Sequence, residues 1–160
     1  MVPPDLFGKM VRVRVNGLLV DKDGLLMVRL ESPVTGGMIW MPPGGGVRFG
    51  EPLIHTLERE MQEETGIDVA PGPLWYLHEV IHPEVHAIEF YFLCEKKGGA
   101  LRTGSDPEYP EEEQIIRDVA FLTFDRLDRE DVHPVHLRRG FARDHGNYLA
   151  GVDMAFPKVI

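Results

Sequence analysis

"GGGVRFGEPLIHTLEREMQEETGI", from Gly44 to Ile67, joins a run of glycines to a segment with helical periodicity. Leu53, Leu57 and Met61 recur every four residues, so a helix places them on one face. This apolar face is expected to pack on a sheet. The stretch therefore predicts a loop of glycines that leads into an amphipathic helix.

The ends of this helix carry their own signals. Glu51-Pro52 indicates the start, because proline is tolerated at the first helical position, where its missing N–H costs nothing. Gly66 indicates the end, since glycine readily takes the left-handed conformation after the last turn. The triple glycine before the helix lets the backbone turn sharply and approach a ligand closely.

Three carboxylates crowd the second half of the helix. Glu60 and Glu64 lie one turn apart, and Glu63 falls beside them on the same strip. Like charges at this spacing destabilise an isolated helix by roughly 0.2–0.5 kcal/mol per pair. A hard divalent cation would offset the repulsion, because such ions prefer carboxylate oxygens. Arg59 lies close enough along the helix to hold one carboxylate in place.

Composition limits the class of protein. The 160 residues suit a single domain over residues 1–160, and 43% hydrophobic residues are enough for a core. A formal net charge of −9 argues against a surface that binds a nucleic acid polymer, but not against a small phosphate-bearing molecule beside a cation. We expect no membrane span and no secretory signal. With Cys94 as the one cysteine, a reducing compartment and a cytoplasmic location are expected.

The remaining chain predicts mostly strands. Two apolar runs around "DKDG" indicate a hairpin, and a short strand is expected at Met38 to Pro42. Further strands are expected at 74–82, 86–97 and 115–124, with a polar loop at 104–113 and a second helix from Pro134 to about His145. This order favours an α+β fold, an α/β/α sandwich around one mixed sheet.

The stretch from Gly45 to Ile67 resembles the Nudix box, a pattern in which glycine, glutamate and a REx₂EExG-type run stand at fixed separations. The matching positions in this chain are Gly45, Glu51, Arg59, Glu60, Met61, Glu63, Glu64, Gly66 and Ile67. The resemblance covers the box strictly and the order of elements loosely. It implies the Nudix α/β/α sandwich and hydrolysis, dependent on Mg²⁺ or Mn²⁺, of a nucleoside diphosphate linked to another moiety.

The resemblance also implies residue roles. Glu60 and Glu64 would be the principal metal ligands, with Glu63 as a third ligand and the Gly45 carbonyl as a fourth. Arg59 and Glu51 would orient the carboxylates. Members of the family differ in the group that accepts the proton from the attacking water, so two sources stay open: Glu63 or Glu64 in the box helix, or the acidic loop residues Glu111, Glu112 and Glu113.

The substrate is less constrained. Pro83, sixteen positions after Ile67, resembles a feature of ADP-ribose pyrophosphatases, whereas activity on nucleoside triphosphates is a comparable alternative. Trp40, His82 and His86 are the candidate substrate-binding residues, and a homodimer is compatible with the family. The alternative function is a sensor that binds a nucleotide without catalysis, although intact glutamates in the box argue against it.

Overall fold

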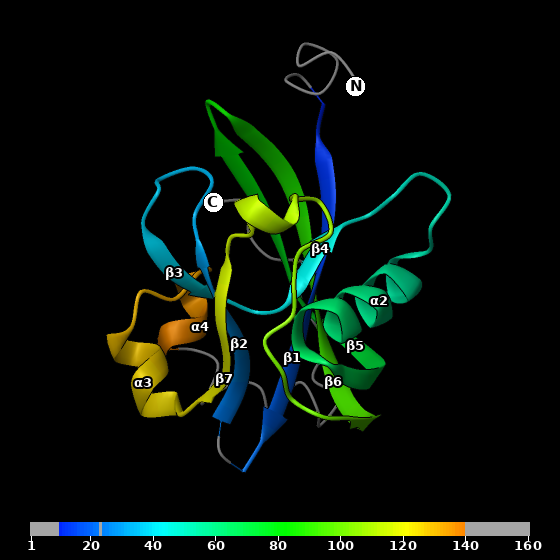
Figure 1. Ribbon diagram of the computed structural model, residues 1–160, viewed down its shortest axis with the longest axis vertical. Coiled ribbons are helices and arrows are strands. Elements are labelled where there is room, and N and C mark those ends of the chain that lie inside the picture. Colours follow the sequence, from blue (N-terminus) through cyan, green and yellow to red (C-terminus); the bar gives the residue numbers. More distant parts are fainter. Residues whose placement is uncertain (1–9, 23, 140–160) are drawn as a thin grey trace.

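The structure is a computed structural model and describes residues 10–22 and 24–139. Its centre is a sheet with the strand order β3-β2-β1-β6-β5, in which β4 also pairs with β1 and β7 with β2. β1 and β6 run parallel, whereas the other paired strands are antiparallel. Helix α2 lies on one side of this sheet, and α3 and α4 lie on the other (Figure 1). The expected α/β/α sandwich around a mixed sheet is confirmed.

The first strands agree closely with the sequence pattern. β1 (Arg12–Asp21) and β2 (Gly24–Glu31) form the predicted hairpin around the "DKDG" turn, with Val20 opposite Leu25. β3 (Met38–Met41) pairs with β2 and ends before Pro42, as expected. Proline ends a strand because it cannot donate a hydrogen bond to a neighbouring strand.

The triple glycine is not the loop that the sequence predicted. Gly44–Gly46 forms strand β4, which pairs antiparallel with β1 so that Gly45 lies opposite Val15. The reason is its pairing with β1, and the close approach of the two strands requires glycine. A Cβ at Gly44 would lie 2.1 Å from the Val15 carbonyl oxygen, which only a residue without a side chain can accommodate.

Helix α2 (Leu53–Thr65) follows the predicted pattern, with one difference at its start. Pro52 has an extended conformation, ψ 145°, and is the N-cap, so the helix begins one residue later than expected. Gly66 ends the helix with φ 74°, the left-handed conformation that was predicted. The buried side chains of Leu57 and Met61 pack on the sheet, where Gly17 of β1 leaves room for both.

The second half of the chain contains two long strands and three short helices. β5 (Ile67–His82) and β6 (Val85–Gly99) extend the expected strands to a hairpin that turns at Pro83 and Glu84. The polar loop contains a short 3₁₀ helix, η1 (Glu111–Glu113), and leads into β7 (Ile116–Leu122). β7 is shorter than predicted because the Thr123 hydroxyl accepts a hydrogen bond from the Arg126 N–H and starts α3 (Phe124–Arg129). Sequence reasoning did not predict α3.

The second predicted helix is described only in part. α4 (His136–Arg139) begins two residues after Pro134, so Pro134 is not its first residue. The remainder of that prediction, to His145, and the expectation about the first nine residues lie outside the described residues.

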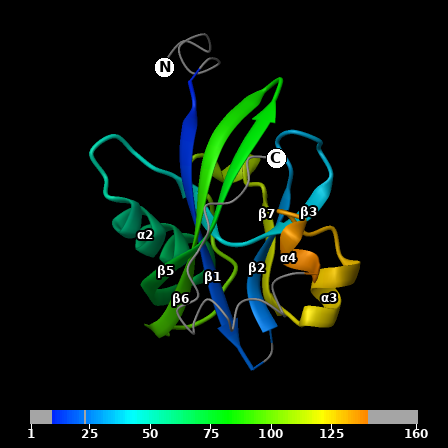
Figure 2. The same cartoon turned by 180° about the vertical axis from the view of Figure 1, so that it is seen from behind.

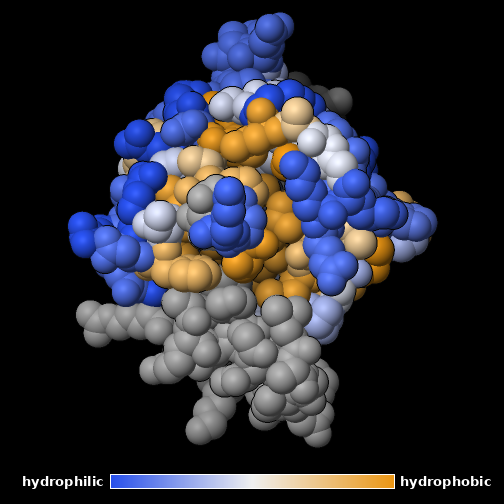
Figure 3. All heavy atoms as spheres, turned by 90° about the horizontal axis from the view of Figure 1, so that it is seen from below, coloured by the Kyte–Doolittle hydropathy of each residue, from blue (hydrophilic) through white to orange (hydrophobic). Residues whose placement is uncertain are grey.

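Two hydrophobic clusters occupy the two faces of the sheet. One lies under α2 and includes Leu57, Met61 and Val15. The other lies under α3 and α4 and includes Trp40, Tyr91 and Leu127. The view from behind shows the same separation of α2 from α3 and α4 (Figure 2). On the face seen from below, hydrophobic residues at the surface gather between hydrophilic ones (Figure 3). The sheet thus carries a hydrophobic cluster on each face, and α2 packs on one of them.

Candidate metal and diphosphate site

The helical spacing of α2 places two glutamates against the sheet. Glu60 and Glu64 are each only 4% exposed, although both carry carboxylates. Burial raises the pKa of Glu60 to about 7. Burial, and then the nearby charge of Glu60, raise the pKa of Glu64 well above its usual range. In their ionised form, two buried carboxylates side by side are costly unless a cation accompanies them.

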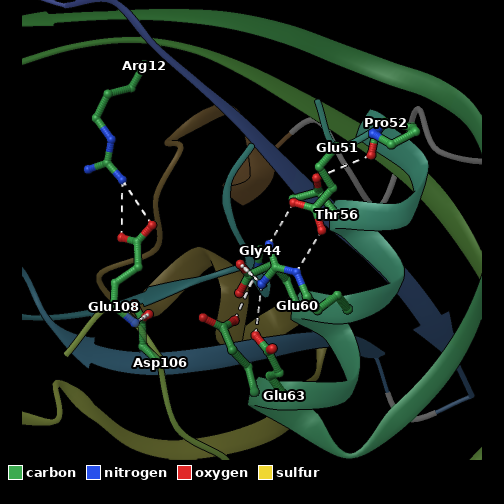
Figure 4. A network of polar contacts seen from close by, with 11 residues as sticks. Arg12, Gly44, Glu51, Pro52, Thr56, Glu60, Glu63, Asp106 and Glu108 are labelled. Atoms are coloured by element: carbon green, nitrogen blue, oxygen red, sulfur yellow. Dashed lines mark hydrogen bonds and ion pairs between the residues drawn. The ribbon is translucent and has the colours of Figure 1, made fainter. Parts of the chain in front are cut away.

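Arg59 joins the carboxylates of Glu51, Glu60 and Glu63 into one network of ion pairs, and Figure 4 shows how these three glutamates lie together. Its Nε and one terminal nitrogen donate to the two oxygens of Glu51, at 2.8 and 3.0 Å. The other terminal nitrogen donates to Glu60 Oε1 at 2.8 Å and to Glu63 Oε2 at 3.0 Å. Hydrogen bonding to Arg59 lowers the pKa of Glu51 to about 2, so Glu51 is ionised at neutral pH. The structure therefore brings these four residues together, and the roles that the resemblance implies for them stay predictions.

The glycine strand lies directly against the carboxylates. The Gly44 N–H donates to Glu64 Oε2 at 3.0 Å. A Cβ at Gly45 would lie 2.4 Å from the Glu60 carboxyl carbon, so the space at Gly45 is reserved for that carboxylate. β4 thus fixes Glu64 through a main-chain N–H and leaves room for Glu60.

A loop that sequence reasoning missed also reaches this site. The N–H groups of Gly104 and Ser105 donate to the carbonyls of Glu64 and Glu63, at 2.8 and 3.3 Å. They hold the half-buried Asp106 near the helix, where its charge adds to the raised pKa of Glu60 and Glu64. Burial also raises the pKa of Asp106 itself. No spacing in the sequence relates Asp106 to the helix, because only the folded chain brings them together.

The acidic triplet that was a candidate proton acceptor lies elsewhere in this loop. Glu111, Glu112 and Glu113 form the exposed helix η1. The loop is instead tied to β1 by Glu108, which accepts from Arg12 at 3.2 Å. Of the acidic residues in this loop, Asp106 is the one whose charge acts on both Glu60 and Glu64.

The three candidate substrate-binding residues do not come together. Trp40 is 5% exposed and belongs to the cluster under α3 and α4, where Arg126 lies 5.8 Å above its ring. His82 is exposed at the tip of the β5–β6 hairpin, and its Nδ1 accepts from the Glu84 N–H at 3.2 Å. His86 lies near that tip and its Nε2 is 2.9 Å from Glu79 Oε1.

The residues around Glu60 and Glu64 fit a divalent cation by their chemistry. Across residues 10–22 and 24–139, no three acidic, histidine or cysteine side chains already enclose a metal-sized space. Two features nevertheless suit such an ion: the donors are carboxylate and carbonyl oxygens, and the space at Gly45 would be filled by any side chain. Arg59 now neutralises oxygens of Glu60 and Glu63 that a metal ion would use.

The buried carboxyl of Glu60 has a measurable consequence for stability. Folding raises the pKa of the Glu60 carboxyl from about 4.5 to about 7. Between these pH values, this carboxyl is therefore protonated in the folded state and ionised in the unfolded state. We expect the free energy of unfolding of the metal-free protein to fall as pH rises from about 4.5 to 7. Glu60→Gln should flatten this slope, measured by denaturant unfolding in EDTA, whereas an unchanged slope would contradict the assignment.

The α/β/α sandwich and the site described above are together typical of a Nudix protein. In this chain, the helix that carries the carboxylates packs behind the glycine strand β4. A model of the NUDIX domain matches residues 10–141, so the chain belongs to this family. The resemblance seen in the box is therefore confirmed. Members of the family generally require divalent metal ions.

Comparisons with known proteins agree with this membership. An 8-oxo-dGTP diphosphatase from Buchnera aphidicola is 42% identical over 59 residues, which are 37% of this chain and 47% of that protein. An ADP-ribose pyrophosphatase from Methanocaldococcus jannaschii is 33% identical over 103 residues, or 62% of this chain and 59% of that protein. The chain thus spans about half the length of these two relatives.

The fold is shared with solved structures. The MutT protein from Methanosarcina mazei Go1 superimposes with a TM-score of 0.67 at 23% identity, covering 87% of this chain and 96% of that one. At this level of identity the likeness concerns the fold alone. In the described part of the chain, no helix has the length and apolar character needed to cross a bilayer.

Proposed function

We propose that the chain is a metal-dependent pyrophosphohydrolase that cleaves a nucleoside diphosphate linked to another moiety, either a nucleotide sugar such as ADP-ribose or a nucleoside triphosphate. The observation that carries this proposal is the pair of buried carboxylates held against β4, Glu60 beside Gly45 and Glu64 bound to the Gly44 N–H. Two buried carboxylates repel each other when both are ionised, and a bound cation would offset that repulsion. The names of the two relatives above include a nucleoside triphosphate and a nucleotide sugar, so they support both substrate classes.

Mg²⁺ or Mn²⁺ would be held by Glu60, Glu63, Glu64 and the Gly45 carbonyl. When bound, such an ion neutralises phosphate oxygens and lowers the pKa of a bound water. Arg59 holds Glu60 and Glu63 in place, and Glu51 in turn fixes the Arg59 guanidinium through two hydrogen bonds. This clamp keeps the carboxylates in one geometry before the substrate arrives, which is how positioned groups lower a barrier.

Glu63 is the box carboxylate best placed to take the proton of the attacking water. Its side chain is 30% exposed, whereas that of Glu60 is 5% exposed. Solvent can therefore reach Glu63, and the released proton can leave from it. Glu64 is fixed by the Gly44 N–H, which suits a ligand rather than a group that moves protons.

The proposal is tested by a panel of nucleotide sugars and nucleoside triphosphates with Mg²⁺, with Mn²⁺ and with EDTA. We expect cleavage at a phosphoanhydride bond that requires a divalent ion, scored as release of phosphate, pyrophosphate or a nucleoside monophosphate. Saturable nucleotide binding without cleavage in any metal would identify a sensor and overturn the proposed hydrolysis.

The same panel tests whether the hairpin tip contacts the substrate. His82 and His86 offer hydrogen-bonding groups suited to a ribose. Replacing His82, Pro83 and His86 together by alanine should change the rank order of substrates more than the metal requirement. If all rates fell equally and the rank order stayed the same, this segment would support the fold alone. Glu84→Gln at the same tip is the matched control.

A further inference from the structure

The last turn of α2 is completed by a segment that is distant in the sequence. The final carbonyls of a helix have no partner within the helix, so other groups must bind them. Here three main-chain N–H groups between β6 and β7, in residues 100–115, which we call the 100–115 loop, bind these carbonyls. They run from Arg102 to Thr65, from Gly104 to Glu64 and from Ser105 to Glu63, at 3.0, 2.8 and 3.3 Å. The loop therefore holds the turn that carries Glu63 and Glu64.

The side chain of Gln114 holds the 100–115 loop in its folded shape. Its Oε1 accepts from the Asp106 N–H at 2.7 Å. Its Nε2 donates to the carbonyls of Asp106 and Tyr109, at 2.8 and 2.7 Å. The Asp106 N–H belongs to the peptide unit that directly follows Ser105, whose own N–H binds α2. Gln114 thus binds the part of the loop that lies next to the helix.

Gln114 is itself fixed by the sheet. β7 begins two residues later, at Ile116, and pairs with β2. The intervening Ile115 carbonyl accepts from the Glu31 N–H of β2 at 3.1 Å. The Gln114 carbonyl accepts from the Arg117 side chain. One side chain therefore connects the loop that completes α2 to a position that two paired strands define.

Two further side-chain links of the 100–115 loop lie at the surface. Arg12 of β1 pairs with Glu108 at 3.2 Å, and these side chains are 47% and 44% exposed. Arg102 donates to the carbonyl and the side chain of Gln62 at 3.1 Å, also in an exposed place. Exposed contacts hold a loop weakly, because water competes for the same groups. The half-buried Gln114, with three bonds to main-chain groups, is therefore the link whose loss should loosen the loop most.

We propose that Gln114 is a positioning residue for the metal site, an inference that rests on the proposed function. It holds the 100–115 loop against α2 and so keeps Glu63 and Glu64 where they can bind one ion together. Without this link the loop separates from α2 more often, and the carbonyls of the last turn lose their partners. Helix ends without partners open readily. Glu64 then leaves the Gly44 N–H more often, and the carboxylates converge less often on one ion.

The test titrates the full chain with Mn²⁺, without substrate, and measures the free ion by EPR. Gln114→Met keeps the length of the side chain and removes its hydrogen bonds. We expect it to raise the Kd for Mn²⁺ about tenfold, the lower end of the effect of losing a group that contacts a metal ligand but not the metal itself. Thr103→Met, a neutral change at an exposed position of the same loop, should leave the Kd unchanged. An increase of less than about threefold for Gln114→Met would overturn the inference.

Amide hydrogen exchange in EDTA shows whether the effect passes through the loop. In Gln114→Met, the N–H groups of Gly104 and Ser105 should exchange at least about tenfold faster than in the wild type. The Thr56 N–H, which binds the Pro52 carbonyl at the other end of α2, should keep its rate. Unchanged exchange at Gly104 and Ser105 would overturn the inference. Equally faster exchange at all three N–H groups would show a loss of stability throughout the fold and would also contradict a positioning role.

A second variant decides the question if Gln114→Met does not fold. Gln114→Asn keeps the neutral amide but is one methylene shorter, so it cannot reach the main chain of Asp106 and Tyr109 together. It should weaken Mn²⁺ binding to a similar extent, and wild-type affinity in this variant would overturn the inference.

The same titration separates this inference from the proposed function, because no hydrolysis is measured. A wild-type chain that binds Mn²⁺ more tightly than Gln114→Met but cleaves no nucleotide would uphold the role of Gln114 and overturn the proposed function. A wild-type chain that cleaves nucleotides and binds Mn²⁺ no more tightly than the variant would overturn the role of Gln114 alone. A wild-type chain that binds no Mn²⁺ would overturn both.

Discussion

Glu64→Gln is expected to reduce turnover by more than about 100-fold while making the metal-free protein more stable. Loss of a group that contacts a metal ligand, but not the metal itself, lowers activity by up to about 100-fold. Because Glu64 is proposed as a direct ligand, its loss should lower activity further. The gain in stability has a separate cause. Burial raises the pKa of the Glu64 carboxyl. This carboxyl therefore lowers the stability of the folded protein at every pH above its pKa in the unfolded chain, and a neutral amide removes this effect. The amide oxygen can still accept from the Gly44 N–H.

Steady-state kinetics with metal, and thermal unfolding in EDTA at pH 8, measure the two effects. Glu58→Gln is the matched control, because Glu58 lies on the same helix and is exposed. It should change neither quantity appreciably. Activity of Glu64→Gln within a few-fold of the wild type would remove Glu64 from the proposed site. Lower activity with lower stability would indicate a damaged fold instead.

Gly45→Ala should have an effect of similar size on turnover through geometry rather than charge. The added methyl group would lie 2.4 Å from the Glu60 carboxyl carbon, so this flexible side chain must turn away. A displacement of about 1 Å in a catalytic constellation can cost about 100-fold. The fold should survive, because the atoms that must move belong to the end of a side chain and not to the backbone.

Two glycine variants give the comparison. At Gly37, a Cβ would meet only the Thr35 hydroxyl oxygen, at 3.5 Å, so Gly37→Ala should keep both activity and stability. At Gly104, a Cβ would lie 1.9 Å from the Glu63 carbonyl oxygen, so Gly104→Ala should lower the thermal midpoint. If Gly45→Ala retained near wild-type kcat/KM, the space at Gly45 would not be needed by Glu60 for catalysis.

The sequence predicted the parts of this molecule that depend on local periodicity. The helix from Leu53 to Thr65, its glycine stop and its apolar face could be read from four-residue spacing, since neighbouring turns fix which side chains align. The carboxylate strip beside Arg59 followed from the same spacing. The two strands around Pro83 were predicted in type, although both proved longer.

Contacts between distant segments could not be predicted in the same way. Gly44–Gly46 became a strand because β1 lies beside it, and no local property of three glycines indicates such a partner. Asp106 reaches the carboxylates through two main-chain hydrogen bonds from its loop to α2. Trp40 was proposed from its place before the glycines, yet alternation along β3 turns its side chain to the opposite core. α3 had a usable signal in Thr123, a residue type that often caps helices.

The glycine composition of β4 also has a consequence for how such a protein can change. The strand lies directly against the site proposed for the diphosphate, and it presents no side chain to that site. Substitutions at sheet positions that face away from α2 can therefore alter the surface around the site while the carboxylate helix stays as it is. An engineer who wished to give this scaffold a new nucleotide preference would leave residues 44–46 untouched and randomise positions on the neighbouring strands that face away from α2.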